Sequence, residues 1–379
     1  MRFYLFVSLL YYNYMKLKKL ILKNYRNYKN FEYNFKSNKT LIIGKNAQGK
    51  TNILEAIYYL CALDSNRIKK DSELILFNET SSSIKAEIEK RGMNFELEID
   101  FNLGKNKILK VNGLKKPKSK DFLRELSGVN FSTNDLLLLR GEPQNRRKWL
   151  DMAIFQVYPL YFEKLSKFNK IRLQKANYLS DSNSINPLML DVFNQQFSVL
   201  SANVIYLRKK YLIELEKIAK IKHKAIAQNE DLKIYYKSIT DDFISVSELS
   251  ELIYQKLNEM KDEEIRKGQC LIGAHRDDID FYINEIDSKK YASQGQQRTI
   301  VLSLKLAELQ IIKDKINETP LLLLDDVLAE LDSIRQNYLL NVIEDDIQMI
   351  ITSVDTLAFE DEFLNNVDIV KIKEGNIVG

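Results

Sequence analysis

The chain has 379 residues, of which 45% are hydrophobic and 29% charged, a balance that excludes a disordered chain, a collagen and a small disulfide-rich protein. A chain of this length is expected to form two structural units, or one domain with a large insertion. The 57 Lys and Arg residues against 52 Asp and Glu residues give a formal net charge of +5, which permits an anionic partner without requiring one.

The apolar N-terminal segment does not predict a membrane protein. Residues 3–14 provide about half of the roughly 20 apolar residues that a spanning helix needs. Asn13-Tyr14-Met15-Lys16 stands where a signal peptide would have small residues before its cleavage site. We therefore expect a cytoplasmic protein, and we treat residues 1–14 as an N-terminal extension that need not be native.

From Met15 onward the pattern predicts strands around a single helix. The apolar periodicity indicates a helix at 51–62 and strands at 17–22, 31–35, 41–43, 84–89, 95–101 and 107–111. The pair Asn112-Gly113 predicts a tight turn, so the later strands are expected to form an antiparallel meander.

Residues 145–266 are rich in Lys, Glu and Leu, with apolar residues three and four apart, and they predict an inserted helical lobe (lobe II). Beyond this lobe we expect a helix at 296–315 and strands at 279–283, 321–324, 349–352 and 369–372. Residues 15–144 and 267–379 would then build one α/β head.

Cysteine and histidine are scarce. Cys61 and Cys270 lack the CxxC spacing of a zinc site, so both are expected to be buried thiols. Two histidines, His223 and His275, are too few for a His-rich metal centre.

The segment Gly44-Lys45-Asn46-Ala47-Gln48-Gly49-Lys50-Thr51 fits G-x-x-x-x-G-K-[ST] and lies between a predicted strand and a predicted helix. Such a loop turns tightly, so that backbone N–H groups and the positive helix end converge on phosphates. Lys50 is expected to bridge the β- and γ-phosphates, and Thr51 to offer its hydroxyl to Mg²⁺. The alternative, an incidental glycine turn, explains less of the pattern.

The run Pro320-Leu321-Leu322-Leu323-Leu324-Asp325-Asp326 predicts a buried strand that ends in two carboxylates. Asp325 is the expected Mg²⁺ partner. Asp326 could orient or deprotonate the attacking water, or it could simply cap a helix. Because Asp is one methylene shorter than Glu, we expect slow turnover.

The segment Tyr291-Ala292-Ser293-Gln294-Gly295-Gln296-Gln297-Arg298 is similar to the signature of ABC ATPases. Five other segments resemble the same family: Leu22–Tyr28, the phosphate loop Gly44–Thr51, Gly141–Asp151, Gly273–Asp278 and Leu324–Asp332. On these motifs the chain from Met15 onward resembles the RecF family of SMC-like ABC ATPases from bacterial recombinational repair.

The resemblance implies an ABC/SMC-type P-loop ATPase head with an antiparallel β subdomain and an inserted helical lobe. It implies that Ser293 and Gly295, with Gln296 behind them, contact ATP bound to the opposite protomer, and that ATP joins a homodimer. It also places Arg26 and Asn27 near the nucleotide and Asp332 in a dimer loop.

The resemblance further implies a function in recombinational repair, replication-gap repair and SOS induction. An ATP-closed dimer would clamp duplex DNA beside single-strand gaps, help load RecA with RecO and RecR, and release DNA after slow hydrolysis. Such a protein would be a weak ATPase associated with the nucleoid.

Two features depart from the family pattern. Ala274 stands where proline is common, so the turn before His275 is expected to be less rigid. Thr352 and Ser353 stand where transporters have a switch histidine, and the Q-loop glutamine is not located. His275 is expected to be a structural or interlobe hydrogen-bonding residue rather than a catalytic base.

Basic residues form three clusters that could bind phosphates, although solvated faces explain each cluster equally well. They are Lys105, Lys107, Lys110, Lys115, Lys116, Lys118 and Lys120; Arg146, Arg147 and Lys148; and Arg208, Lys209 and Lys210. The family resemblance favours DNA as the partner.

Three other functions remain as alternatives. A transporter's nucleotide-binding subunit is disfavoured by the wide separation of Lys50 and Asp325 and by the missing switch histidine. A structural SMC protein is disfavoured because the helical insertion is short. An ATP-gated nuclease would need an additional acidic metal cluster.

Overall fold

The computed structural model describes residues 14–65, 67–181, 185–242, 244–357 and 359–378, and the chain divides into two compact units. Unit 1 comprises residues 1–135 and 305–379, and unit 2 comprises residues 136–304. These bounds differ from the expected ones, because residues 136–144 and 267–304 belong to the unit that contains the helical insertion. Of the expected N-terminal extension, residues 1–13 lie outside the described residues.

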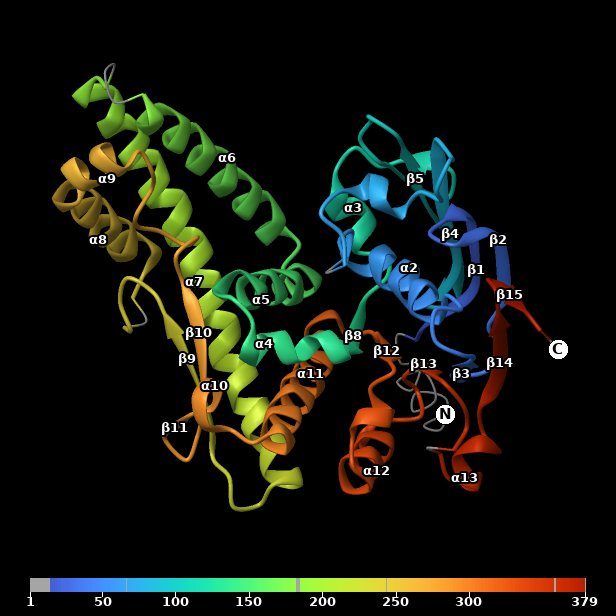
Figure 1. The fold of residues 1–379 in the computed structure, drawn as a ribbon. Helices are drawn as coiled ribbons and strands as arrows, with labels where there is room; N and C mark the ends of the chain where they lie inside the picture. The colour runs from blue at the N-terminus through green and yellow to red at the C-terminus, as the bar shows by residue number, and fades with distance from the viewer. Residues whose placement is uncertain (1–13, 66, 182–184, 243, 358, 379) are drawn as a thin grey trace, which may run out of the picture. The chain divides into compact units, whose positions relative to one another are not determined.

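An antiparallel sheet of six strands forms one part of unit 1 (Figure 1). Its order is β2-β1-β4-β5-β6-β7. The strands are β1 (Met15–Tyr25), β2 (Tyr28–Asn34), β4 (Ser81–Lys90), β5 (Met93–Asn102), β6 (Ile108–Val111) and β7 (Leu114–Lys115). Asn112 and Gly113 both have positive φ in the turn between β6 and β7, which confirms the predicted turn and meander.

A second six-stranded sheet in unit 1 has the order β15-β14-β3-β13-β12-β8 and is parallel except at β15. The strands are β3 (Lys39–Ile43), β8 (Gly128–Ser132), β12 (Leu321–Asp325), β13 (Met349–Ser353), β14 (Asp368–Lys373) and β15 (Asn376–Ile377). Residues 321–324 are all buried, as expected for a strand covered on both faces. Parallel pairing brings the carboxyl ends of β3, β12 and β13 to one edge of the sheet.

Helix α2 (Lys50–Ala62) packs against β8, β12 and β13 of this parallel sheet. The other short elements of unit 1 connect the strands at its surface. They are η1 (Asp71–Leu74), α3 (Ser119–Leu123), η4 (Leu328–Glu330), α12 (Ser333–Val342) and α13 (Asp361–Leu364), and η2 (Thr133–Leu136) follows β8 at the unit boundary.

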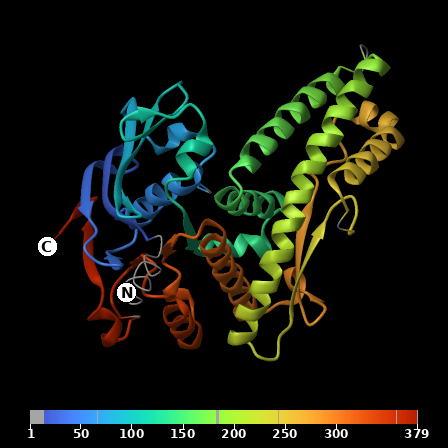
Figure 2. The same cartoon turned by 180° about the vertical axis from the view of Figure 1, so that it is seen from behind.

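Unit 2 is built around α7 (Pro187–Ile226), a 40-residue helix that runs the length of the unit in Figure 2. Helices α5, α6 and α8 pack against it. The further helices are α4 (Leu137–Arg140), α5 (Pro143–Val157), α6 (Leu160–Ser180), α8 (Val246–Glu259), α9 (Lys261–Lys267) and α10 (Ser288–Tyr291). Helix α11 (Gln294–Ile316) begins in unit 2 and ends in unit 1.

A small antiparallel sheet of unit 2 corrects the sequence analysis. β9 (Leu232–Lys237) interrupts the stretch expected to be helical, and it pairs with β10 (Asp278–Ile283), the strand expected in the head. β11 (Ile286–Asp287) completes the sheet. The strands lie in unit 2 because β9 packs against α7 and β10 pairs with β9.

Several charged side chains lie inside unit 2. Lys175 and Glu264 form an ion pair of 2.6 Å with both side chains almost fully buried. Arg208 of α7 binds both carboxylate oxygens of Asp151 at 2.8 and 2.9 Å. A pair of buried charges is tolerated only when each charge has its partner, so these contacts fix how the helices pack.

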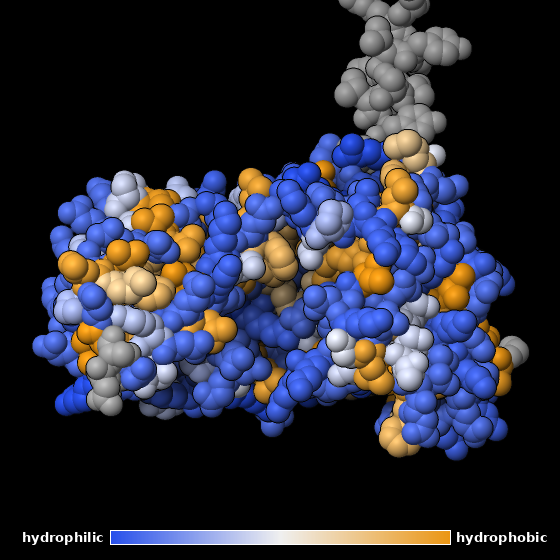
Figure 3. Space-filling view, turned by 90° about the horizontal axis from the view of Figure 1, so that it is seen from above, coloured by the Kyte–Doolittle hydropathy of each residue, from blue (hydrophilic) through white to orange (hydrophobic). Residues whose placement is uncertain are grey.

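Hydrophobic side chains also reach the surface of unit 2. On α6 and α7, Leu173, Leu188, Met189, Val192 and Val199 are at least 46% exposed. Figure 3 shows hydrophobic residues at the surface among hydrophilic ones. No helix among the described ranges is both long and apolar enough to cross a bilayer.

Replacing Lys175 by Met should lower the free energy of unfolding of unit 2 by about 3–5 kcal/mol, because the Glu264 carboxylate would stay buried without a counter-charge. Adding Glu264→Gln should restore most of the loss. Urea unfolding followed by the fluorescence of Trp149, the single tryptophan of the chain and a residue of α5, measures both effects. A double variant no more stable than the single variant would contradict this account.

Candidate nucleotide-binding site

The predicted phosphate loop connects β3 to α2, as the sequence indicated. Gly49 has a φ of 105° immediately before α2, and a Cβ atom there would lie 2.6 Å from the Asn27 side chain. Ala47 also has a positive φ. Glycine at position 49 therefore lets the loop turn tightly where a larger residue would both strain the backbone and collide with β1–β2.

The loop presents a row of backbone donors. Among the described residues, none of the N–H groups from Lys45 to Gly49 donates a hydrogen bond to the protein. Lys50 is buried, and its ammonium group donates to the carbonyl oxygens of Gly44 at 2.6 Å and of Lys45 at 3.2 Å. The lysine charge is thus held inside the curve of the loop, where an anion of the phosphate type fits.

Thr51 and Asp325 meet at the edge of the parallel sheet. The Thr51 Oγ1 hydroxyl donates to Asp325 Oδ1 at 2.9 Å, across 274 residues of sequence. Thr352 Oγ1, at the end of β13, donates to the same oxygen at 2.8 Å. Burial raises the pKa of Asp325, although the hydrogen bonds from Thr352 and Thr51 act in the opposite direction. Hydroxyl and carboxylate oxygens of this kind are the ligands that Mg²⁺ prefers.

Of the two residues expected near the nucleotide, Asn27 contacts the loop and Arg26 contacts α2. Arg26 binds the two carboxylate oxygens of Glu55 on α2 at 2.7 and 2.8 Å. Asn27 accepts a hydrogen bond from Asn52 and donates to the Gln48 carbonyl at 3.4 Å. Arg26 is therefore anchored by α2, whereas Asn27 contacts the loop itself.

A small pocket of about 30 Å³ adjoins Thr51 and Asp325, which is room for about one water-sized group. It is lined by residues that the sequence analysis did not single out, among them Glu55, Arg67, Asn130, Ser132 and Asn134. The buried Oδ1 atom of Asn130 has no hydrogen-bond partner within the part of the chain that the structure describes. Ser132 is the last residue of β8 and Asn134 follows it, but this position becomes informative only once β8 is paired beside β12.

The two other acidic candidates, Asp326 and Asp332, differ in whether they cap a helix. Asp326 has a φ of 54°, and its backbone N–H donates to Thr352 Oγ1 at 3.0 Å. The cap position of the next turn is Val327, so the capping alternative for Asp326 is not supported. Asp332 does act as a cap, because its Oδ1 accepts a hydrogen bond from the Arg335 N–H at 3.0 Å at the start of α12.

The signature-like segment lies in unit 2, while the phosphate loop belongs to unit 1. Ser293 is exposed and forms a reciprocal cap with Gln296, since Gln296 N–H donates to Ser293 Oγ and Ser293 N–H donates to Gln296 Oε1. Gln297 accepts a hydrogen bond from Arg140 of α4 at 2.6 Å. Gly295 lies in the first turn of α11.

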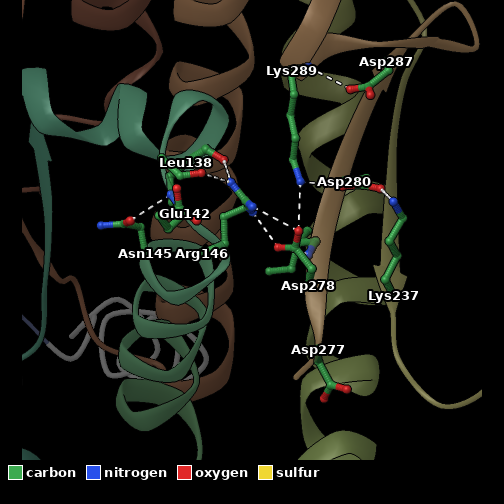
Figure 4. Close-up of polar contacts among 12 residues, drawn as sticks. Leu138, Glu142, Asn145, Arg146, Lys237, Asp277, Asp278, Asp280, Asp287 and Lys289 are labelled. Atoms are coloured by element: carbon green, nitrogen blue, oxygen red, sulfur yellow. Dashed lines mark hydrogen bonds and ion pairs between the residues drawn. The ribbon is translucent and has the colours of Figure 1, made fainter. Parts of the chain in front are cut away.

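Two other segments that resemble the family, Gly141–Asp151 and Gly273–Asp278, are joined near the signature-like segment by ion pairs (Figure 4). Arg146 of α5 donates to both oxygens of Asp278 at 2.6 and 3.0 Å. Lys289, which lies in α10 just before the signature-like segment, donates to Asp278 at 3.1 Å and to Asp280 at 2.5 Å. Lys237 of β9 also pairs with Asp280. These contacts fix α10 to β10 and thereby fix the approach to Ser293.

The basic clusters divide into internal and exposed groups. Arg146, Arg208 and Lys209 are buried, and Lys209 donates to the carbonyls of Thr240 and Asp242. Treating the second and third clusters as phosphate-binding surfaces is therefore wrong for these three residues. In the first cluster Lys107 donates to Tyr59 and Leu63, and Lys110 pairs with Glu98 and Asp100.

Comparison with known protein families matches residues 16–377 to the RecF/RecN/SMC N terminal domain. The DNA replication and repair protein RecF of Bacillus mycoides (strain KBAB4) is 38% identical over 369 residues, which cover 96% of this chain and 98% of that protein. RecF of Bacillus cytotoxicus is 38% identical over 367 residues, with the same coverage of both chains.

Solved structures give the same result. The structure of the recombination mediator protein RecF with ATP has a TM-score of 0.90 against this chain and a sequence identity of 32%. The match covers 97% of this chain and 98% of the RecF chain. The Smc head domain of Pyrococcus furiosus, at 14% identity and 96% coverage of both chains, has a TM-score of 0.54 and shows the fold alone. The predicted fold class is confirmed.

Replacing Asp325 by Asn should stabilise unit 1 at neutral pH while removing the carboxylate from the site. Because folding raises the pKa of Asp325, the ionised carboxylate costs stability above its folded pKa, and this cost disappears below the ordinary aspartate pKa of about 3.9. The melting temperature of the variant should exceed that of the wild type at about pH 7 and approach it near pH 4. Asp326→Asn is the matched control, and a destabilised Asp325→Asn protein at pH 7 would refute the argument.

Proposed function

The chain belongs to the RecF family, and on that premise we propose that it is an ATP-driven DNA clamp of recombinational repair, replication-gap repair and SOS induction. The observation that carries the proposal is the 2.9 Å contact between Thr51 and Asp325, because it joins a phosphate loop to a distant acidic strand at one sheet edge. ATP binding is supported by the ATP complex of the RecF relative.

Mg²⁺ would be held at this edge by Thr51 and Asp325, and it would neutralise charge on the β- and γ-phosphates. The unpaired N–H groups of residues 45–49 would bind phosphate oxygens, and the Lys50 ammonium group would turn from the loop carbonyls toward the β- and γ-phosphates. Asn27 would position the loop from the side of β1–β2. Asp326, which does not cap a helix, would orient or deprotonate the attacking water.

The signature-like segment would act on a second copy of the chain. Ser293 is exposed at the N-terminal end of α11, where helix donors and the helix dipole favour an anion. Contact of Ser293, Gly295 and Gln296 with ATP held by the partner copy would close a homodimer, with Asp332 near the dimer contact. Slow hydrolysis would then open the clamp.

The DNA partner is supported by the lysine-rich segment 105–120, which contains seven lysines and no acidic residue. Lys105, Lys115 and Lys118 are exposed, Lys116 is half-exposed, and no described residue forms an ion pair with any of these four side chains. Lys110 and Lys107 are engaged within unit 1 and would not take part. Contacts of this kind bind the phosphate backbone of duplex or gapped DNA without reading its sequence.

The cellular partners follow from family membership. The solved RecF relatives are described as recombination mediators of the RecFOR pathway. We extend that description to this chain, so that RecO and RecR are its expected mediators and the ATP-closed dimer helps them to place RecA on single strands beside the gap.

Ser293→Arg should leave ATP binding by the monomer intact but abolish the ATP-dependent dimer, because the arginine would collide with the partner's nucleotide. Lys50→Met should abolish both. Light scattering during size exclusion, with ATP and Mg²⁺ and with or without a gapped duplex, measures the change. Ile286→Arg is the control, since it adds the same side chain at an exposed position of β11. A normal dimer from Ser293→Arg would contradict the contact in trans.

Replacing Lys105, Lys115, Lys116 and Lys118 together by Gln should weaken duplex binding and flatten its dependence on salt. Each lost phosphate contact lowers the slope of log affinity against log salt concentration by about 0.9. The control replaces four exposed lysines elsewhere, Lys29, Lys36, Lys217 and Lys224, and has the same net charge. Equal slopes for the two variants would remove segment 105–120 from the DNA surface.

A further inference from the structure

The loop between α9 and β10 contains the segment Gly273-Ala274-His275-Arg276-Asp277, for which the proposed function has no use. Gly273 has a φ of 118°, and a Cβ atom there would lie 2.6 Å from the Phe197 ring of α7. The Ala274 N–H donates to Ser201 Oγ at 2.9 Å, and Arg208 donates to the Ala274 carbonyl at 2.6 Å. The loop is thus fixed on α7 although alanine replaces proline at position 274.

His275 is held in one orientation by this loop. Its Nε2 atom lies 3.1 Å from the carbonyl oxygen of Cys270, and its ring lies 6.1 Å from the rings of both Phe168 and Phe197. A nitrogen that faces a carbonyl carries the proton, so Nδ1 is the unprotonated atom. Nδ1 is buried and has no hydrogen-bond partner within the described ranges.

Three arginines from three different segments surround His275. Arg276 donates to the Cys270 carbonyl at 2.8 Å, Arg147 of α5 donates to the Asp277 carbonyl at 2.6 Å, and the buried Nε of Arg172 on α6 has no partner among the described residues. Burial and then the three arginines lower the pKa of His275 to about 4. No carboxylate of a described residue forms an ion pair with any of these guanidinium groups.

The acidic residues of this region form hydrogen bonds and ion pairs with residues other than these three arginines. Asp277 accepts from Tyr236 at 2.5 Å and lies 3.6 Å from Arg208, and Asp278 binds Arg146 and Lys289. Glu264 binds Lys175. Three guanidinium groups therefore lie around His275 without a carboxylate of a described residue in direct contact, although Asp277, Asp278 and Asp151 act on Arg147 from a greater distance. An outside anion would supply the close partner that these groups lack.

We propose that Arg147, Arg172 and Arg276 form, beside His275, a site for a phosphate group, and that in the working protein this group belongs to the DNA backbone. The planar guanidinium group binds two oxygens of a phosphate at once, and three of them on fixed elements suit an anion with several oxygens. The DNA backbone and inorganic phosphate both offer this phosphate chemistry. The choice of DNA as its source rests on the proposed function.

The two histidines of the chain provide a direct test by NMR. Full-length protein labelled at the histidine ring carbons is titrated with inorganic phosphate and, separately, with a 12-base-pair duplex. Either ligand should shift the ring signal of His275 and raise its pKa from about 4, because an anion offsets the field of the arginines. The signal of His223, which pairs with Glu230 at 2.9 Å, should stay in place.

The matching variant is Arg172→Gln with Arg276→Gln, and the control is Arg266→Gln, whose side chain is 75% exposed on the neighbouring helix α9. The double variant should lose roughly tenfold in duplex affinity, because it removes two of the three guanidinium groups that would donate charge-assisted hydrogen bonds to the phosphate. It should also remove the phosphate-induced shift of His275. Unchanged Trp149 fluorescence establishes that unit 2 is folded.

The possible outcomes separate this site from the proposed function. If neither ligand moves the His275 signal, the site is refuted. A shift with phosphate but not with a duplex that the protein binds would refute DNA as the source. A shift with polyglutamate alone would refute the phosphate assignment. If the protein binds no duplex at all, the DNA function fails, while the phosphate titration still decides the site.

Discussion

The contact between Thr51 and Asp325 is the constraint on which the arrangement of unit 1 depends. It requires β12 to lie in the same parallel sheet as β3, with β13 between them, so that the loop after β3 and the carboxylate after β12 reach one edge. The buried leucines 321–324 stabilise β12 as an interior strand of the sheet, between β13 and β8. Because burial makes the Asp325 charge costly, this edge is held at some expense to stability, as is common at sites that bind an ion.

Local patterns were sufficient for much of the fold. The alternating strands of the meander, the helix after the phosphate loop and the run Leu321–Leu324 each carry their own signal, and all are present. β9 was missed because Leu232–Lys237 is a six-residue strand, and its partner β10 lies more than forty residues away. Pairing across such a distance leaves no local signal, and the error moved the expected domain boundary with it.

The candidate site residues divide in the same way. The phosphate loop and Asp325 are predicted from residue type and spacing, whereas Asn130 and Ser132 are brought beside them only by the register of β8 against β12. The basic clusters show the limit most clearly. Arg146 and Arg208 look like surface cations in sequence, but each is bound by a carboxylate more than fifty residues away, Asp278 and Asp151 respectively. A run of basic residues in the sequence does not show whether its side chains are buried or exposed to solvent.

Helix α11 connects the two halves of the candidate machinery within one continuous element. Its first turn contains Ser293's capping partner Gln296, and its second half belongs to unit 1. There the buried Lys305 ammonium lies 3.0 Å from Asp135, whose other carboxylate oxygen accepts the Ser132 N–H at 2.6 Å. Ser132 lines the pocket beside Thr51 and Asp325. The part of α11 that belongs to unit 1 is therefore anchored, through one buried ion pair, to the strand end beside Thr51 and Asp325.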